Sequence, residues 1–323
     1  MIELREVTKR YGSTSAVQNL SFTVEPGQIT GFLGPNGAGK TTTMRLILGL
    51  DSPTIGAVTV NGQSYRDKDA PIQEVGALID PSAVHSGRSA YYHLLWQAQA
   101  GGLPHRRVDE VLDMVGLSGV AGKKVGGFSL GMLQRLGIAS AMLGDPPVLL
   151  FDEPVNGLDP EGVQWVRSLM KRFADEGRTV FVSSHLMSEM EQTADHVLVI
   201  GRGHLVADMT MAAFTQRSAH SHVRVVSTQA HELVTHLKAR GAAVTNGTSN
   251  ELMVTGLDTA TVGAIAFEQG ILLTELASQR ASLEDAFMEM TRDSVEYRAG
   301  SGRFQNATDH QLPTRELAAE RIH

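Results

Sequence analysis

Short apolar runs alternate with amphipathic stretches along the first two-thirds of the chain. Residues 28–33, 75–79 and 147–151 are apolar runs with the length of buried strands. Stretches with helical spacing follow at residues 40–49 and 160–175. Buried strands that alternate with amphipathic helices are typical of a parallel sheet covered on both faces. The pattern therefore predicts an α/β domain with a mixed or parallel core sheet.

The sequence predicts two further groups of elements beside these alternating strands and helices. Strands on either side of a turn at Tyr11–Gly12 predict an antiparallel subdomain at the N-terminus, and a third strand runs into Asn61–Gly62, a pair typical of a hairpin turn. Helices predict a helical subdomain at about residues 81–145, in which Ser129 stands as the N-cap of a helix. The remaining expected strands are 2–9, 16–24, 57–60, 179–183, 196–200 and 204–208, and the expected helices of the subdomain are 89–101, 105–115 and one beginning near Leu130.

The pattern changes after about Phe214. The order strand, helix, strand, strand, helix, strand follows, which predicts a small ferredoxin-like α+β domain at residues 217–297, behind a first domain at residues 1–216. Residues 298–323 are polar and aperiodic, and we expect this tail to be disordered. The expected elements are strands 223–227, 243–245, 252–255 and 271–274, helices 229–240 and 258–269, and a closing helix at 283–290.

Composition narrows the class of protein. The 323 residues are 42% hydrophobic and 20% charged, as in folded globular proteins, and the net charge of −7 argues against a nucleic-acid-binding surface as the main function. The chain contains no cysteine, so disulfides and thiol chemistry are excluded. The N-terminus lacks the apolar core of a signal peptide, and no apolar run has the length of a membrane span. We therefore expect a soluble, cytoplasmic protein that reaches a membrane only through a partner.

The segment after the strand at residues 28–33 matches the phosphate-loop pattern G-x-x-x-x-G-K-[ST] and precedes an amphipathic helix. Glycines let consecutive backbone N–H groups point at phosphate oxygens, and the following helix adds the positive end of its dipole. Lys40 is expected to reach the β- and γ-phosphates, and Thr41 to ligate Mg²⁺. The alternative is a glycine turn before a helix that happens to carry a lysine. The expected nucleotide-binding residues here are Gly34, Pro35, Asn36, Gly37, Ala38, Gly39, Lys40, Thr41 and Thr42.

Acidic and basic groups also stand at the ends of later strands. Asp152 and Glu153 follow the apolar run at 147–151, and His185 follows the strand at 179–183. The carboxyl ends of parallel strands are where ligands bind in open α/β folds. We therefore expect Asp152 to hold Mg²⁺, Glu153 to polarise the attacking water, and His185 to contact the γ-phosphate.

Together these stretches resemble the ATP-binding subunits of ABC transporters across roughly residues 1–215. Residues 34–41 are similar to the Walker A motif of that family and residues 148–153 to its Walker B motif. The resemblance implies that Tyr11 stacks on adenine, although a turn tyrosine is also a common surface residue, and it identifies His185 with the switch histidine. Residues 128–132 stand at the family signature Leu-Ser-Gly-Gly-Gln, with Ser129, Gly131 and Met132 as expected nucleotide contacts, and residues 156–159 resemble the D-loop, which adds Asp159.

The resemblance also implies partners and a mechanism. A second cassette, identical or different, is expected to place its Ser129 and Gly131 against the ATP of the first, so that ATP holds a head-to-tail dimer together and hydrolysis releases it. A separately encoded membrane permease is expected to receive the motion and to hold the protein at the inner face of the cell membrane. Residues 283–291 resemble the tail of drug- and antibiotic-export subunits, which favours export. The substrate is not readable, because its contacts lie in the permease.

The sequence departs from the family at two places. Leu130 and Met132 replace a glycine and the glutamine of the signature, while Ser129 and Gly131 are retained. Asp80 stands where the family usually has the glutamine of the Q-loop. A carboxylate near the γ-phosphate is tolerable only with Mg²⁺ between them, so we expect Asp80 to be a metal ligand. The alternative is an aspartate that caps the turn before Pro81.

Two other functions are compatible with a phosphate loop. A soluble ABC ATPase acting on the ribosome or DNA is the main alternative, but ribosome-acting members usually carry two cassettes and DNA-repair members a long coiled coil. A small-molecule kinase is the second alternative, and it does not explain residues 128–132 or His185. The sequence therefore favours an ATP-hydrolysing transport subunit.

Overall fold

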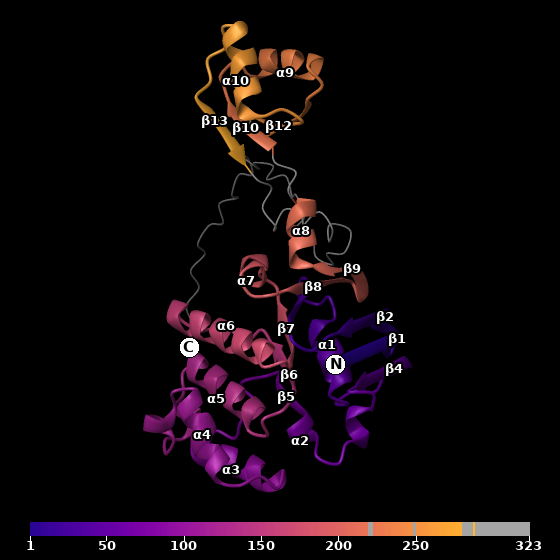
Figure 1. Ribbon diagram of the computed structural model, residues 1–323, viewed down its shortest axis with the longest axis vertical. Coiled ribbons are helices and arrows are strands. Elements are labelled where there is room, and N and C mark those ends of the chain that lie inside the picture. The colour runs from indigo at the N-terminus through magenta and orange to yellow at the C-terminus, as the bar shows by residue number, and fades with distance from the viewer. Residues whose placement is uncertain (219–221, 248–249, 280–286, 288–323) are drawn as a thin grey trace, which may run out of the picture.

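The computed structural model describes residues 1–218, 222–247, 250–279 and Phe287. A six-stranded sheet in the order β5-β6-β7-β3-β8-β9 forms the centre of the first part (Figure 1). Neighbouring strands in it are parallel, except for the antiparallel pair β8 and β9. The prediction of an α/β fold with a mixed core sheet is confirmed. The strands are β3 (Ile29–Leu33), β5 (Val75–Leu78), β6 (Val148–Asp152), β7 (Thr179–Ser184), β8 (His196–Gly201) and β9 (His204–Thr210).

The central strands are apolar throughout because both faces of the sheet are covered. In β6, Leu149 and Phe151 belong to a core shared with helices, while Val148 and Leu150 belong to a second core shared with the N-terminal sheet. Side chains of a strand alternate between faces, so one strand supplies both cores. A continuous apolar run is therefore the correct signature of a strand at this position.

The N-terminal sheet is antiparallel, in the order β2-β1-β4, as predicted. Its strands are β1 (Ile2–Tyr11), β2 (Thr14–Val24) and β4 (Ile55–Val60). A tight turn follows β4, with left-handed backbone at Asn61 and Gly62. The expected hairpin turn is confirmed, because Val60 and Gln63 form an antiparallel bridge with two backbone hydrogen bonds across it. The pairing extends no further before the chain enters a 3-10 helix.

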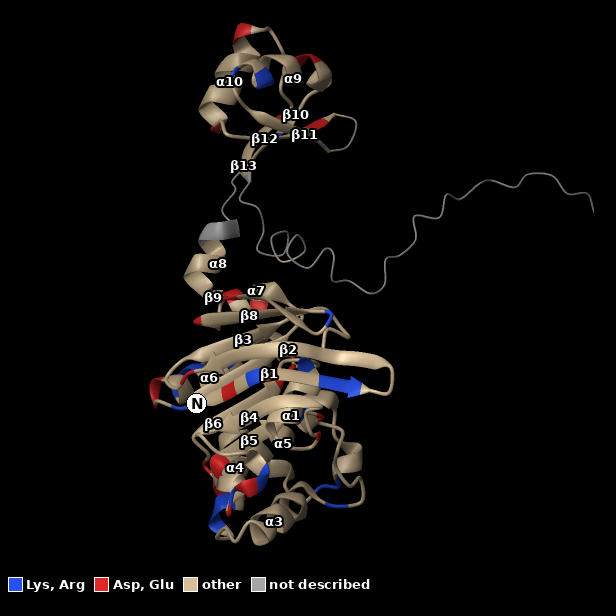
Figure 2. Cartoon of the chain, turned by 90° about the vertical axis from the view of Figure 1, so that its right-hand side faces the viewer, with Lys and Arg blue, Asp and Glu red and all other residues tan. Residues whose placement is uncertain are grey.

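Three helices of the helical subdomain lie together at one end of the molecule (Figure 1), with buried residues on the sides that face one another. The exposed side of α4 carries both charge signs (Figure 2), including an ion pair of 2.5 Å between Arg107 and Glu110. The helices of the first part are α1 (Lys40–Ile47), α2 (Pro71–Glu74), α3 (Ala90–Ala100), α4 (Arg106–Met114), α5 (Leu130–Met142), α6 (Pro160–Asp175), α7 (Met187–Glu191) and α8 (Met211–Ser218), with 3-10 turns η1 (Tyr65–Asp67), η2 (Ser118–Val120) and η3 (Val125–Gly127). No helix among the described residues has the length and apolar character that a bilayer crossing requires.

The second part has its own antiparallel sheet, in the order β11-β12-β10-β13. Two helices pack on one face through a separate core, which includes Leu233, Val254 and Ile265. Element order and strand order are those of a ferredoxin-like fold, as predicted. The elements are β10 (His222–Val226), α9 (Ala230–Ala239), β11 (Ala243–Asn246), β12 (Glu251–Thr255), α10 (Thr259–Glu268) and β13 (Glu275–Gln279).

The last strand of this part lies four residues later than predicted. The apolar residues 271–274 were expected to form it, but the pairing partner of β10 is β13, at Glu275–Gln279. Ile271 is buried in the core and Leu272 is 70% exposed. This apolar run therefore connects α10 to β13 and is not itself a strand of the sheet. The expected closing helix at 283–290 and tail at 298–323 lie outside the described residues, apart from the buried Phe287.

Candidate functional site

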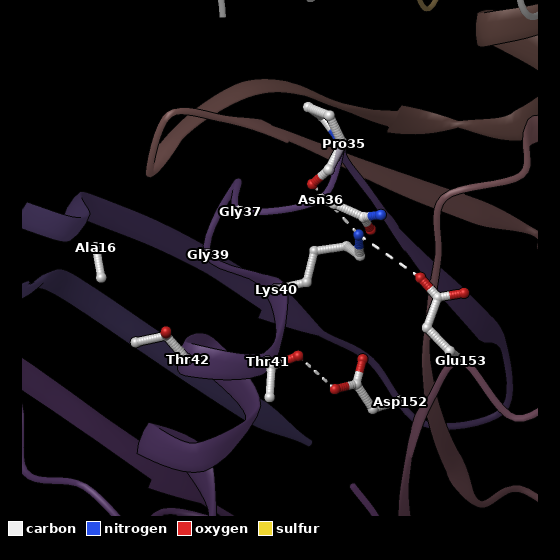
Figure 3. Close-up of a pocket in the computed structure, with 10 residues that line it drawn as sticks. All are labelled: Ala16, Pro35, Asn36, Gly37, Gly39, Lys40, Thr41, Thr42, Asp152 and Glu153. Carbon is white, nitrogen blue, oxygen red and sulfur yellow. Dashed lines mark hydrogen bonds and ion pairs between the residues drawn. The ribbon is translucent and has the colours of Figure 1, made fainter. Parts of the chain in front are cut away.

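The phosphate loop joins the end of β3 to the first residue of α1. Gly39 has a φ of +107°, and a Cβ there would lie 2.6 Å from the carbonyl oxygen of Ala16, so the loop requires glycine at this point. The loop, the start of α1 and the end of β6 enclose one pocket (Figure 3). Its lining residues are Ala16, Pro35, Asn36, Gly37, Gly39, Lys40, Thr41, Thr42, Asp152 and Glu153.

Lys40 is the cation of this pocket, and only 7% of its surface is exposed. Its Nζ donates to the carbonyl oxygen of Gly34 at 2.7 Å and lies 3.6 Å from Oε1 of Glu153. Burial lowers the pKa of Lys40, and the nearby carboxylates of Glu153 and Asp152 oppose that shift. The lysine is therefore a partly desolvated cation in the pocket that the loop encloses, where it is available to an anion.

Asp152 binds two hydroxyl groups at the bottom of the same pocket. The Thr41 hydroxyl donates to Oδ2 of Asp152 at 2.6 Å, and the Ser183 hydroxyl donates to Oδ1. A threonine hydroxyl beside a carboxylate is a set of oxygen ligands that Mg²⁺ accepts. These residues therefore fit the predicted metal site.

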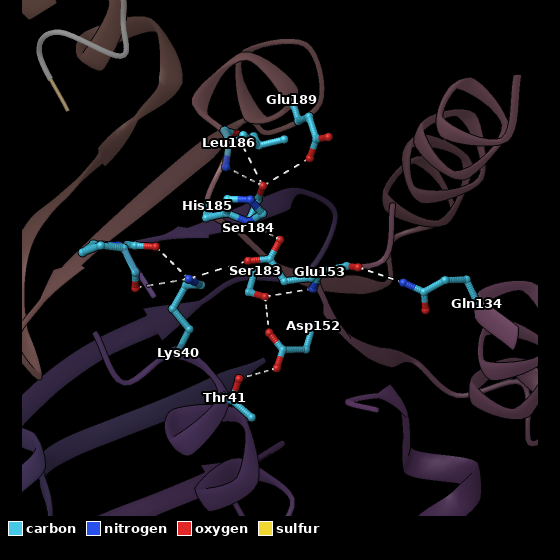
Figure 4. A network of polar contacts seen from close by, with 12 residues as sticks. Lys40, Thr41, Gln134, Asp152, Glu153, Ser183, Ser184, His185, Leu186 and Glu189 are labelled. Carbon is cyan, nitrogen blue, oxygen red and sulfur yellow. Dashed lines mark hydrogen bonds and ion pairs between the residues drawn. The ribbon is translucent and has the colours of Figure 1, made fainter. Parts of the chain in front are cut away.

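Glu153 stands between Lys40 and His185. Its Oε2 is 2.8 Å from Nδ1 of His185, and its Oε1 is 3.6 Å from Nζ of Lys40 (Figure 4). The three groups come from the carboxyl end of β6, the end of β7 and the start of α1. The structure thus brings together the predicted base, the predicted switch histidine and the lysine predicted to bind phosphate.

Glu189 is a further carboxylate close to this group, next to Ser184 in space. The Ser184 hydroxyl donates to Oε2 of Glu189 at 3.2 Å. Burial raises the pKa of Glu189, and the hydrogen bond from Ser184 opposes the shift. The ionised form of this second carboxylate near Glu153 is therefore disfavoured.

The signature residues line a different pocket. Ser129 caps α5 by accepting from the backbone N–H of Met132 at 3.3 Å, as predicted. Leu130, which replaces a family glycine, packs against Gly157, where a Cβ would meet Leu130 Cδ2 at 2.3 Å. This pocket and the phosphate pocket have no lining residue in common. Its lining residues are Ser129, Leu130, Gly131, Met132, Arg135, Gly157 and Asp159.

Two predicted site residues lie apart from both of these pockets. Tyr11 is 47% exposed, and its hydroxyl donates to Asp51 at 2.8 Å. Asp80 accepts from the backbone N–H of Ser82 at 2.8 Å and from its hydroxyl at 2.6 Å, which is the turn-capping contact that was the alternative for this residue. Neither side chain lines the phosphate pocket as the described residues delimit it. Adenine stacking and metal binding remain predictions for these two residues.

Sequence reasoning missed two buried polar residues that organise the carboxylates. Ser183 is fully buried and contacts both Asp152 and Glu153, and Gln134 donates to the backbone oxygen of Glu153. A serine inside a strand and a glutamine inside a helix carry no local signal of such a contact. Only the pairing of β6 with β7, which sets Asp152 opposite Ser183, could have indicated the first of them.

The relatives found by comparison with known proteins include ATP-binding proteins of ABC transporters. A family model described as ABC transporter matches residues 17–156, and one described as a domain of unknown function matches residues 221–284. The bacitracin transport ATP-binding protein BcrA of Bacillus licheniformis is 42% identical over 68% of this chain and 72% of its own length. The uncharacterized ABC transporter ATP-binding protein YhcH of Bacillus subtilis is 36% identical over 92% of this chain and 97% of its own.

Solved structures of ABC transporter ATP-binding subunits have a fold similar to that of this chain. An ATP-binding subunit of an ABC transporter is 26% identical with a TM-score of 0.61, and the match covers 67% of this chain and 92% of that chain. A bacterial ABC transporter cassette, solved as a dimer, is 25% identical with a TM-score of 0.60 over 65% of this chain and 99% of that chain.

Proposed function

Since this chain belongs to the ATP-binding proteins of ABC transporters, we propose that it is the ATP-hydrolysing subunit of an exporter and drives a separate membrane permease. The chain is an ATPase of this family, and relatives carry the names bacitracin and lantibiotic transport ATP-binding protein. Export of a peptide antibiotic or a similar drug is therefore the activity that we assign to the complete transporter.

The observation that carries the proposal is the position of Glu153 between Lys40 and His185, beside a phosphate loop. Lys40 holds the γ-phosphate and neutralises charge on it. Glu153 accepts a hydrogen bond from the attacking water and increases its nucleophilicity. His185 contacts the γ-phosphate and keeps the Glu153 carboxylate oriented through the 2.8 Å contact. Hydrolysis of the γ-phosphate is the chemistry that these groups support together.

Mg²⁺ belongs to the proposed site. Thr41 and Asp152 would hold it, and when bound it neutralises charge on the β- and γ-phosphate oxygens. The hydrogen bond from Ser183 fixes the carboxylate of Asp152, so that one of its oxygens stays directed at the Thr41 hydroxyl. The protein residues thus orient the oxygen ligands in advance.

The separation of the two pockets supports a head-to-tail dimer, which we include in the proposal. The exposed N-terminus of α5, with Ser129 and Gly131, offers backbone N–H groups but faces a pocket distinct from the one that contains Lys40. In the dimer, these groups of one protomer contact the γ-phosphate held by the other. ATP therefore stabilises the closed dimer, and hydrolysis releases it.

Substitution of Glu153 tests this assignment. Glu153→Gln keeps the size of the side chain and removes the base, so we expect retained ATP binding, a loss of turnover of about two orders of magnitude or more, and an ATP-dependent dimer measurable by light scattering. Glu161→Gln makes the same chemical change at an exposed position of α6 and serves as the control. Turnover of Glu153→Gln within a few-fold of the parent protein would reject Glu153 as the base.

A further inference from the structure

Glu153 has a backbone conformation that side-chain-bearing residues rarely adopt. Its φ is +49°, in the left-handed region favoured by glycine. Such a conformation persists where surrounding contacts fix it, and it is concentrated at functional sites. The carboxylate of Glu153 thus depends on whatever holds its main chain.

Both main-chain polar groups of Glu153 are held by side chains from other elements. The N–H donates to the Ser183 hydroxyl at 3.0 Å, and the carbonyl oxygen accepts from Nε2 of Gln134 at 3.0 Å (Figure 4). The same carbonyl oxygen also accepts from the backbone N–H of Asn156 in the following turn, at 3.2 Å. Ser183 lies in β7 and Gln134 in α5. The peptide groups on the two sides of the Glu153 Cα are therefore anchored to two different elements.

Gln134 is an unusual residue for the interior of α5. It is 2% exposed, and its Oε1 is buried without a partner among the described residues. Because the carbonyl oxygen of Glu153 can only accept, the amide nitrogen must face it. A buried glutamine with one unsatisfied group costs stability that an apolar side chain would not. Packing of the helix alone therefore gives no reason for a glutamine at this position.

We propose that Gln134 is a positioning residue for ATP hydrolysis, which holds the main chain of Glu153 so that its carboxylate points at the attacking water. The inference rests on the proposed role of Glu153 as the base. Gln134 makes its contact through the peptide group that follows Glu153, and Ser183 makes its contact through the one that precedes it. Loss of the Gln134 contact leaves the Glu153 carbonyl held only by the Asn156 N–H of its own turn, and no longer tied to α5. The carboxylate, Lys40 and His185 remain chemically intact.

Two substitutions separate positioning from packing. Gln134→Met keeps length and volume but cannot donate, so we expect kcat to fall on the order of tenfold to a hundredfold, with the KM for ATP unchanged. Gln134→Glu repels the carbonyl when ionised and donates to it when protonated. Its kcat relative to the parent should therefore recover as the pH is lowered from about 8 to about 6, because burial raises the pKa of a glutamate.

Ser140→Ala is the matched control. Ser140 lies on the same helix, and its buried hydroxyl also lacks a partner among the described residues, but it has no contact with Glu153. We expect kcat to stay at the parent value. Thermal unfolding of every variant reports on packing separately from activity.

The outcomes distinguish this inference from the proposed function. A Gln134→Met protein with parental kcat, while Glu153→Gln is inactive, would overturn the positioning role alone. Equal losses in Gln134→Met and Gln134→Glu at every pH, accompanied by lower thermal stability, would also overturn it, since packing would then explain both. An active Glu153→Gln protein would overturn the role of Glu153 and the positioning role with it.

Discussion

At the scale of single residues, the site depends on charges that are kept away from water. Burial of the Lys40 ammonium group costs free energy of solvation. A carbonyl oxygen at 2.7 Å and the carboxylate of Glu153 at 3.6 Å offset this cost. The phosphates of a nucleotide would give this cation a stronger partner and would oppose the lowering of its pKa by burial. Nucleotide affinity should therefore depend directly on the lysine charge.

Lys40→Ala tests that dependence. We expect nucleotide affinity to fall about tenfold to a hundredfold, the amount expected for losing a hydrogen bond from a charged donor. Titration of a fluorescent ATP analogue measures it, and Lys171→Ala, at an exposed position of α6, is the control. Equal affinities of Lys40→Ala and the parent would show that the nucleotide binds elsewhere.

Asp80 is the residue for which the sequence prediction and the observed contacts differ most. The predicted metal ligand binds Ser82 across a turn. If Asp80 approaches the nucleotide when ATP is bound, its charge requires Mg²⁺ between the carboxylate and the phosphates. Asp80→Asn should then weaken the Mg²⁺ dependence of ATP binding and retain the binding itself.

Mg²⁺ titrations of nucleotide affinity decide the role of Asp80. Asp113→Asn, at an exposed position of α4, makes the same change away from the site. If the titrations of Asp80→Asn and the parent protein superimpose, and stimulation of ATP hydrolysis by the membrane partner is also unchanged, Asp80 is an ordinary turn-capping residue and not a metal ligand.

At the scale of elements, helix ends and buried strands were predictable, while contacts between distant side chains were not. The helix at 160–175 was predicted with the bounds observed for α6, because Asp159 and Pro160 mark its start in the local sequence. The strand at 271–274 was placed too early, because hydrophobicity does not tell which residues pair with β10. The contact of Gln134 with Glu153 spans 19 positions and depends on how α5 packs beside β6.

The cap of α10 gives a test at this scale. Asp258 accepts from the backbone N–H of Thr261 at 2.8 Å. Hydrogen bonding to the Thr261 side chain, and then to its backbone N–H, lowers the pKa of Asp258. The stabilisation is present above the unfolded pKa and is lost as the pH falls through the folded pKa. Asp258→Ala should therefore speed amide hydrogen exchange in α10 several-fold at neutral pH, and less at acidic pH.

Asp258→Asn is the matched control for the cap. Asparagine retains the capping oxygen, so protection from exchange should be kept, but the pH dependence of that protection relative to intrinsic exchange rates should disappear. Exchange in α10 that is unaffected by Asp258→Ala would contradict the assignment of this cap.

At the scale of the whole molecule, the second part has a hydrophobic core of its own, although Phe287 packs into the core of the first part. The residues of the second core, including Leu233 and Val254, all lie after position 222. Among the described residues, those that line the phosphate pocket all lie before position 154. We therefore propose that residues 1–216 bind ATP without residues 217–297. This division gives the second part an accessory role outside nucleotide chemistry.

A version of the chain that ends at Gln216 tests the division. It should bind ATP with the affinity of the full chain, provided that circular dichroism shows it folded. A folded truncated protein that cannot bind the nucleotide would place part of the site in the second domain.

The most direct test of the transport function is affinity purification of the full chain from detergent-solubilised membranes of its own cell, followed by ATPase assay and mass spectrometry of the complex. We predict that a protein with several membrane spans is retained, that it stimulates ATP hydrolysis, and that the Glu153→Gln complex shows no turnover. Recovery with ribosomes or DNA in place of a membrane protein would contradict the transport function and favour a soluble ABC ATPase.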